Sequence, residues 1–137
     1  MLFNPEESIN FQGHTGPFIQ YTHARIVALG RKAQEQNLTG GDFSTVTALH
    51  ETEAELIQHL AAYPAAVAEA ARQLAPSVIG QYAYDLAKAF NRFYAEVPVL
   101  AEEDTARRAL RLALTQRVGE QLRVSMSLLG IKVPERM

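Results

Sequence analysis

Apolar side chains recur every three or four residues along most of this 137-residue chain, and no stretch alternates strictly between apolar and polar residues. This spacing gathers apolar side chains on one face of a helix, whereas a half-buried strand needs strict alternation. Prolines separate the periodic segments, and proline suits the first turn of a helix because its missing N–H would have no intrahelical partner there. The pattern therefore predicts an all-α bundle of four or five helices with mostly short connections.

The expected order is a helix from Pro17, a loop at residues 37–47, a helix from Thr52, a helix from Pro64, a helix from Ser77 to about Glu96 and a helix from Thr105 to Leu129. The side chains expected to face the core recur with helical spacing. In chain order they are Ile19, Thr22, Ile26, Leu29 and Ala33; Leu56, Ile57 and Leu60; Val67, Ala70, Ala71 and Leu74; Ile79, Tyr82, Ala83, Leu86, Phe90 and Phe93; and Leu110, Ala113, Leu114, Val118, Leu122 and Leu129.

Local signals refine three helix details. Thr52 and Glu55 have the spacing of a capping box, in which a hydroxyl and a carboxylate satisfy the first amides of a helix. Gly119 lies inside a helix at a propensity cost of about 1 kcal/mol relative to Ala, which indicates a close approach to a neighbouring helix. Gly130 is expected to end the last helix in a left-handed conformation, with an apolar contact from Ile131.

Composition excludes several classes of protein. The chain has no cysteine, so it has neither disulfides nor thiolate sites, and no apolar run approaches the roughly 20 residues that cross a bilayer. A soluble, cytoplasmic protein without a membrane partner is therefore expected. The net charge is −2, but residues 1–75 hold four basic and eight acidic side chains, while residues 76–137 hold nine basic and seven acidic ones. A polyanion should therefore prefer the C-terminal half.

No pattern indicates catalysis or a metal site. The four histidines (His14, His23, His50 and His59) are never three or four residues apart, so we expect them to be solvated or hydrogen-bonded rather than ligands. The acidic run Glu102–Asp104 precedes a helix and is expected to complement its N-terminal dipole. The stretch Gly13–Gly16 has too few glycines to form a phosphate-binding loop.

One helix face could bind RNA. The outer arc, which we define as the face of the helix at Ser77–Glu96 opposite its core stripe, combines an aromatic ring, amides and cations. Unpaired RNA is held by such a mixture, because rings stack on bases, amides read base edges and cations contact phosphates. An ordinary solvated face remains the alternative. Tyr82 lies at the margin of the core stripe. The outer arc comprises Gln81, Tyr84, Asp85, Lys88, Asn91 and Arg92.

Several ordered motifs resemble the class I arginyl-tRNA synthetases. Residues 7–26 are similar to the end of that family's catalytic domain and the start of its all-helical anticodon-binding domain. Residues 76–100, with Tyr82–Lys88 and Phe90–Tyr94, resemble the central helix of the anticodon-binding domain. Residues 128–137 resemble the family's C-terminus, which ends in Glu-Arg-Met.

The resemblance implies residues 1–17 as a remnant of the end of a catalytic domain and residues 18–137 as the anticodon-binding domain. The family's ATP site has a His-x-Gly-His signature that is absent here, so no cofactor is expected in this fragment. ATP and magnesium would serve the full-length ligase, which attaches arginine to its tRNA. The implied partners are the tRNA for arginine and the parent's own catalytic domain.

The resemblance also implies roles for individual residues. Tyr84 or Tyr82 would stack on an anticodon base, and Tyr84 is favoured because periodicity turns Tyr82 inward. Lys88 and Asn91 would give phosphate and polar contacts, with Arg92 as a further cation, and Met137 would pack against the loop. The alternative is a helical protein-interaction module that binds no RNA. Residues 1–17, with three apolar side chains (Phe3, Ile9 and Phe11), are also expected to allow self-association.

Overall fold

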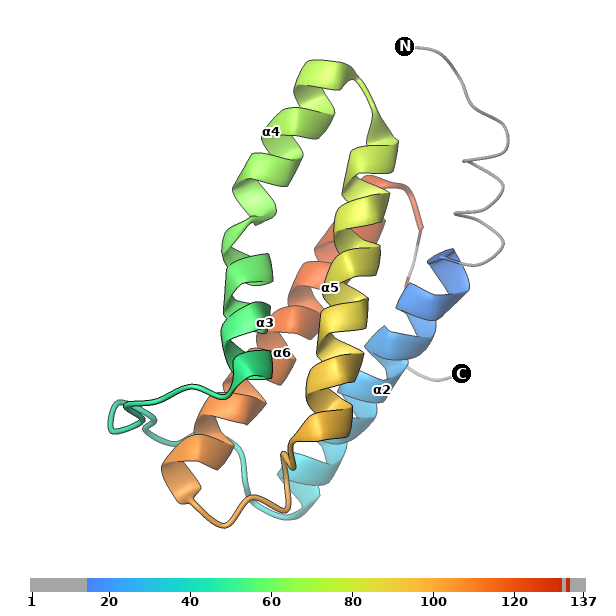
Figure 1. Cartoon of the computed structure of the whole chain (residues 1–137). Coiled ribbons are helices and arrows are strands. Elements are labelled where there is room, and N and C mark those ends of the chain that lie inside the picture. The colour runs from blue at the N-terminus through green and yellow to red at the C-terminus, as the bar shows by residue number, and fades with distance from the viewer. Residues whose placement is uncertain (1–14, 132, 134–137) are drawn as a thin grey trace.

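The computed structural model describes residues 15–131 and 133, and over these residues the chain forms five α-helices and no strand (Figure 1). This confirms the predicted all-α bundle. The central helix α5 packs against each of the other four helices. In Figure 1, α3 and α4 follow one another on one side of α5, and α2 lies on its other side. The helices are α2 (Gly16–Glu35), α3 (Glu51–Ala61), α4 (Tyr63–Gln73), α5 (Pro76–Glu96) and α6 (Thr105–Leu128).

Prolines mark the starts of three helices. Two of these starts were predicted, and the third helix, α5, begins at Pro76, one residue before the predicted start at Ser77. Pro17, Pro64 and Pro76 stand within the first two positions of α2, α4 and α5. Leu74 takes a left-handed conformation with φ of 52°, which ends α4 and lets the chain reverse into α5. This φ is unfavourable for a residue with a branched side chain, so the reversal is held by the packing of the helices that it joins.

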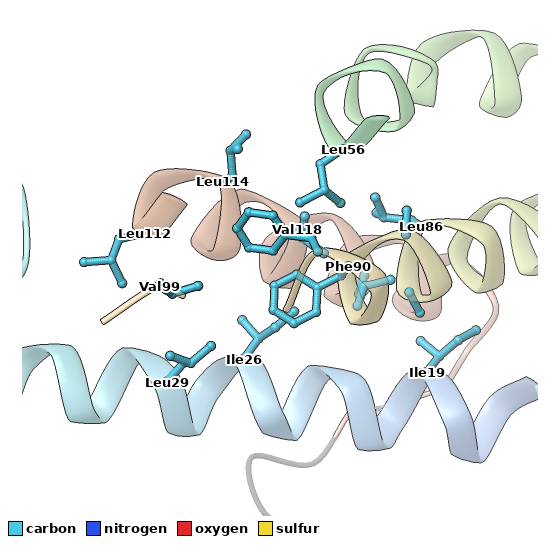
Figure 2. Packing of buried hydrophobic residues seen from close by; sticks show 14 of the residues in the cluster. Ile19, Ile26, Leu29, Leu56, Leu86, Phe90, Val99, Leu112, Leu114 and Val118 are labelled. Carbon is cyan, nitrogen blue, oxygen red and sulfur yellow. The ribbon is translucent and has the colours of Figure 1, made fainter. Parts of the chain in front are cut away.

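The predicted core stripes of α2 and α5 are buried, and so are Leu110, Leu114, Val118 and Leu122 of the α6 stripe, so that the three helices meet over a shared core (Figure 2). Ala113 and Leu129 of the predicted α6 stripe are only partly buried. The predictions for α3 and α4 are partly wrong. Ile57 is 38% exposed and Leu74 is 75% exposed, and α4 contains no buried residue. The reason is that α4 packs mainly on α5, with a small contact to α3, so the partner surface is too small to cover a four-residue stripe.

Gly119 lies at a close approach between α6 and α2, which confirms the prediction. A Cβ atom at this position would lie 2.7 Å from Cγ2 of Ile26. Isoleucine is branched at Cβ and stiff about χ1, so this methyl group cannot easily move aside. The end of α6 also follows the prediction. Gly130 has φ of 75°, and the Ile131 amide donates to the Met126 carbonyl oxygen at 2.9 Å.

The predicted capping box at Thr52 and Glu55 is wrong by two residues, because His50 is the N-cap of α3. The Thr52 amide donates to Nδ1 of His50 at 3.1 Å, and the His50 amide donates to the Glu53 carboxylate at 2.7 Å. A histidine nitrogen thus replaces the expected hydroxyl. Of the acidic run before α6, Asp104 satisfies the start of the helix as predicted, since it accepts bonds from the Ala106 and Arg107 amides.

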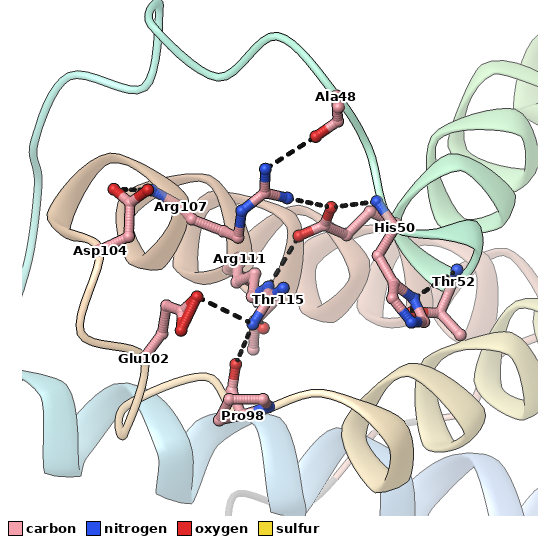
Figure 3. Close-up of polar contacts among 10 residues, drawn as sticks. Ala48, His50, Thr52, Pro98, Glu102, Asp104, Arg107, Arg111 and Thr115 are labelled. Atoms are coloured by element: carbon pink, nitrogen blue, oxygen red, sulfur yellow. Dashed lines mark hydrogen bonds and ion pairs between the residues drawn. The ribbon is translucent and has the colours of Figure 1, made fainter.

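Glu53 is the centre of a buried polar cluster between α3 and α6. Its partners Arg107 and Arg111 are labelled in Figure 3. Its side chain is 0% exposed, and its carboxylate accepts bonds from Arg111 Nε at 2.7 Å and from Arg107 Nη1 at 3.0 Å. Arg111 also donates to the Pro98 carbonyl oxygen at 2.8 Å and lies 3.7 Å from the Glu102 carboxylate. The cluster therefore joins α3 and α6 to the chain that connects α5 with α6.

Gly119→Ala should destabilise the fold although alanine is the better helix former. The added methyl would overlap Ile26, and such overpacking costs about 1–3 kcal/mol, more than the gain in helix propensity of about 1 kcal/mol. Gly30→Ala is the matched control, because a Cβ there meets nothing within 4 Å. Urea unfolding should show a lower midpoint for Gly119→Ala and a higher one for Gly30→Ala. Equal shifts in both variants would contradict the close approach.

Glu53→Gln should lower the free energy of unfolding by about 3 kcal/mol, because it removes the closer and fully buried of the two carboxylates that face the buried Arg111. Glu103→Gln is the control, since it makes the same change of charge at an exposed residue just before α6. Chemical denaturation followed by circular dichroism measures both. A Glu53→Gln variant as stable as Glu103→Gln would mean that the cluster does not hold the bundle together.

Candidate nucleic-acid interface

Tyr84 is held on the face of α5 that adjoins the start of α2. Its ring is half-buried and packs edge-on against Phe18, with ring centroids 5.5 Å apart. The exposed Lys88 lies one turn further along, with Nζ 4.6 Å from the centroid of the Tyr84 ring. The same ammonium is 3.6 Å from the Asp85 carboxylate. The outer arc therefore presents a fixed ring with a cation above it, a geometry that suits stacking next to a phosphate.

Tyr82 is a core residue with a satisfied hydroxyl. It is buried, its hydroxyl donates to the His59 carbonyl oxygen at 2.7 Å, and its ring packs 5.6 Å from that of Tyr63. Burial raises the pKa of Tyr82 to about 12, and the neighbouring Tyr63 adds to this rise. The inward orientation predicted from periodicity is therefore observed. Tyr84 is the more accessible of the two rings.

Asn91 ties α5 to α2. Its amide nitrogen donates to Thr22 Oγ1 at 2.8 Å and to the Ala87 carbonyl oxygen at 2.9 Å, while its oxygen accepts from Arg25 Nη1 at 2.7 Å. An amide with these partners orients Arg25, so Asn91 could contribute to an RNA site through that guanidinium as well as directly.

Arg92 faces carboxylates from two helices. Its guanidinium lies 2.9 Å from Glu55 and 3.0 Å from Glu51 on α3, and 3.5 Å from Glu96 on its own helix. The hydrogen bond to Glu51 and the neighbouring carboxylates raise the pKa of Arg92. Three acids around one cation reduce the positive potential that a phosphate would meet at this position. Met137, the last residue of the predicted site, lies outside the described residues.

Sequence reasoning missed Arg25 of α2. Its Cζ atom lies 5.2 Å from the ring centroid of Tyr21 and 4.7 Å from that of Tyr94 on α5. Arg25 and Tyr94 are 69 residues apart in the chain, so no local pattern could pair them. The signal that was available is the spacing of Tyr21 and Arg25, four residues apart on one helix face.

The three histidines that the structure describes lie in different surroundings. His23 is buried in α2, His50 caps α3, His59 is 4.0 Å from Glu55, and His14 lies outside the described residues. Over residues 15–131 and 133, no three His, Cys, Asp or Glu side chains are arranged to hold a metal ion. Within the same part of the chain, no helix is both long enough and apolar enough to cross a membrane.

Comparison with known proteins identifies the family. The profile of the DALR anticodon binding domain matches residues 19–137. The chain belongs to this family. The arginine–tRNA ligases of Phocaeicola vulgatus and Amoebophilus asiaticus are 47% and 46% identical to it, over 100% of this chain but only 23% of each ligase. The Thermus thermophilus arginyl-tRNA synthetase matches with a TM-score of 0.79 and 37% identity, over 98% of this chain and 23% of that one.

The resemblance to the anticodon-binding domain of arginyl-tRNA synthetases is thus confirmed, while the chain spans less than a quarter of these ligases. The roles expected for Tyr82, Tyr84, Lys88, Asn91, Arg92 and Met137 stay predictions, as do the boundaries at residues 1–17 and 18–137.

The raised pKa of Tyr82 predicts a loss of stability in alkali. Its phenol ionises near pH 10 when unfolded and near 12 when folded, so the folded state binds more protons between these values and stability falls as the pH rises through them. Tyr82→Phe should flatten this fall, and Tyr94→Phe should leave it unchanged. Urea midpoints measured across this pH range test the prediction, and parallel curves for wild type and Tyr82→Phe would contradict it.

Proposed function

We propose that this chain recognises the anticodon loop of the tRNA for arginine as part of an arginine–tRNA ligase. The observation that carries the proposal is the match of residues 19–137 to an anticodon-binding family, together with relatives that are arginine–tRNA ligases over the whole of this chain. The all-helical domain would hold the loop while a separate domain performs the chemistry.

Tyr84 and Lys88 are the residues that we favour for direct contact. A base stacked on the accessible face of Tyr84 would bring its phosphate close to the Lys88 ammonium, which already lies above that ring. The rigid contact between Tyr84 and Phe18 would reduce the conformational entropy lost on binding. The negative charge of Asp85, beside Lys88, would repel the phosphate, so stacking on Tyr84 would supply much of the affinity.

The other predicted residues would support this contact from different places. Tyr82 would set the position of α5 from inside the core, and Asn91 would hold Arg25 and α2 in register. Arg92, surrounded by acids, would contribute a weaker phosphate contact. Met137 would pack against the loop.

ATP and magnesium would bind to a catalytic domain of the full-length ligase, and we expect this chain alone to attach no arginine. We expect that ligase to act in the cytoplasm. Arginine–tRNA ligase relatives of which this chain matches 23% support such an arrangement.

A helical protein-interaction module remains a second candidate because Ile57 and Leu74 leave apolar surface exposed on the α3 and α4 side. A helix of another protein, or a neighbouring domain, could cover these side chains. Such a module would bind no RNA even at low salt, which separates it from the first proposal. Self-association through residues 1–17 would also need no RNA.

Tyr84→Ala should weaken binding of an anticodon stem-loop of the arginine tRNA roughly tenfold, because one stacked base contributes about 1–3 kcal/mol. Tyr84→Phe keeps the ring and should keep the affinity. Lys88→Ala should lower the slope of log affinity against log salt by about 1, and Arg72→Ala on α4 should not. Fluorescence anisotropy of a labelled stem-loop over a salt series measures all four variants.

Circular dichroism of each variant separates a change of binding from a loss of folding. Folded Tyr84→Ala and Lys88→Ala variants with unchanged affinity would contradict the assignment of this surface. A wild-type chain that fails to bind the stem-loop at low salt would contradict the proposed function itself.

A further inference from the structure

The reversal between α4 and α5 places Leu74 in a backbone conformation that leucine does not favour. Its φ of 52° lies in the left-handed region, which glycine adopts freely and a residue with a Cβ atom adopts only at a cost in free energy. The Leu74 amide donates to the Ala71 carbonyl oxygen at 3.2 Å, and the Ala75 amide donates to the Ala70 carbonyl oxygen at 3.0 Å. This pair of bonds commonly ends a helix with glycine at the position that Leu74 occupies.

The Leu74 side chain gains little from packing in this chain. It is 75% exposed, the largest exposed fraction of any large apolar side chain among residues 15–131 and 133. Neither the backbone nor the side chain therefore explains a leucine at this position within the chain alone. A strained conformation that presents an apolar side chain to solvent indicates a contact with another surface.

The surroundings of Leu74 suit a protein partner better than RNA. We define the α4–α5 tip as residues 71–77. Arg72 is the only basic residue of this segment, and it forms an ion pair with Glu69, so little positive charge is left to attract a phosphate backbone. The other exposed residues of the tip carry no charge. They are Ala71, Gln73, Pro76 and Ser77. An apolar side chain with an uncharged border fits an apolar pocket of a protein.

The α4–α5 tip projects beyond the start of α2. These two helices run side by side in the same direction, since Phe18 packs on Tyr84 and a second contact, seven residues further along each helix, joins Arg25 to Asn91. Helix α5 begins eight residues before Tyr84, whereas α2 begins only two residues before Phe18. At about 1.5 Å per residue, α5 extends roughly 9 Å further than α2 at this end. Figure 1 shows the α4–α5 turn beyond the first turn of α2.

This end of α2 is where the rest of a ligase would join. Residues 7–26 resemble the passage from the catalytic domain into the anticodon-binding domain, and the chain matches only 23% of its arginine–tRNA ligase relatives. We propose that Leu74 inserts into an apolar pocket on the domain that precedes α2 in the full-length ligase. Burial of the side chain would offset the unfavourable φ, and the contact would fix the tilt of the bundle on that domain. The inference rests on the proposed function, since the ligase supplies the partner.

The first test uses the 137-residue chain alone. Leu74→Asn should leave the urea midpoint unchanged or raise it, because asparagine adopts the left-handed conformation more readily than leucine and the chain loses no buried contact. Leu49→Asn is the matched control, since Leu49 is 49% exposed in the loop before α3. Leu56→Ala, which removes a fully buried side chain, gives the loss typical of the core. A fall for Leu74→Asn as large as that for Leu56→Ala would make Leu74 a structural residue of this chain and overturn the inference.

The second test adds the missing partner. This chain replaces the segment that matches it in the arginine–tRNA ligase of Amoebophilus asiaticus, and hydrogen exchange of residues 70–78 is measured by mass spectrometry in this chimera and in the chain alone. Exchange should be about tenfold slower in the chimera, as for the burial of one leucine side chain. Leu74→Asn should abolish this difference, and Leu74→Met, which keeps an apolar side chain of similar size, should preserve it. Leu49→Asn should leave the difference unchanged.

The outcomes separate this inference from the proposed function. Equal exchange in the chimera and in the chain alone would overturn the inference, and the function would stand if the chain binds the anticodon stem-loop. Slower exchange in the chimera of a chain that binds no stem-loop would contradict the function and keep the contact. Exchange in the chain alone that slows with protein concentration would assign Leu74 to a second copy, and a loss of stem-loop affinity in Leu74→Asn would assign it to RNA. Either of these two results would overturn the inference.

Discussion

The bundle depends on one buried carboxylate. Moving a charged Glu53 side chain out of water is unfavourable by several kcal/mol, and only close, well-oriented counter-charges offset that penalty. Arg111 and Arg107 from α6 and the backbone amide of His50 supply these partners. Because guanidinium groups bind carboxylates through directed N–H bonds, the cluster fixes how far α3 can slide along α6. The apolar core alone, which is less directional, would permit several such registers.

A second polar link does the same on the opposite side of α5. Asn91 joins α5 to Thr22 and Arg25 of α2, so the central helix is located by directed bonds on the α2 side while the Glu53 cluster fixes α3 against α6. Three arginines, Arg25, Arg107 and Arg111, form hydrogen bonds to residues of other helices in this way. An arginine held in this way has fewer N–H donors left for a ligand.

The sequence predicted the parts of the fold that local chemistry determines. Pro17 and Pro64 marked helix starts, and the three-to-four spacing identified the core faces of α2 and α5 and most of that of α6, because both signals lie within one turn of chain. The polar clusters could not be found in this way. Glu53 meets Arg111 from 58 residues away, and Arg25 meets Asn91 from 66 residues away. The cap of α3 was misplaced because a histidine nitrogen accepts the bond that the pattern assigns to a hydroxyl.

The candidate surface shows the same division. The outer arc was correctly grouped by helix geometry, but its charges could be judged only once Glu51 and Glu55 of α3 were seen beside Arg92. Counting charge by halves of the chain assigned the basic region to residues 76–137. Three of the four basic residues of residues 1–75, namely Arg25, Arg31 and Lys32, line one concave surface beside α2. Where charges lie in space therefore matters more than the net charge of a segment.

The unbroken form of α2 has a mechanical consequence. Its 20 residues form a single helix about 30 Å long. The first turn at Gly16 and the residues Leu29–Lys32 near the other end belong to this one helix. Because Gly119 has no side chain, α6 contacts the middle of α2 at Ile26, and this contact is a point about which α2 can tilt. A rotation or tilt of the N-terminal end of α2 would therefore also move its C-terminal end, because the helix is continuous between them.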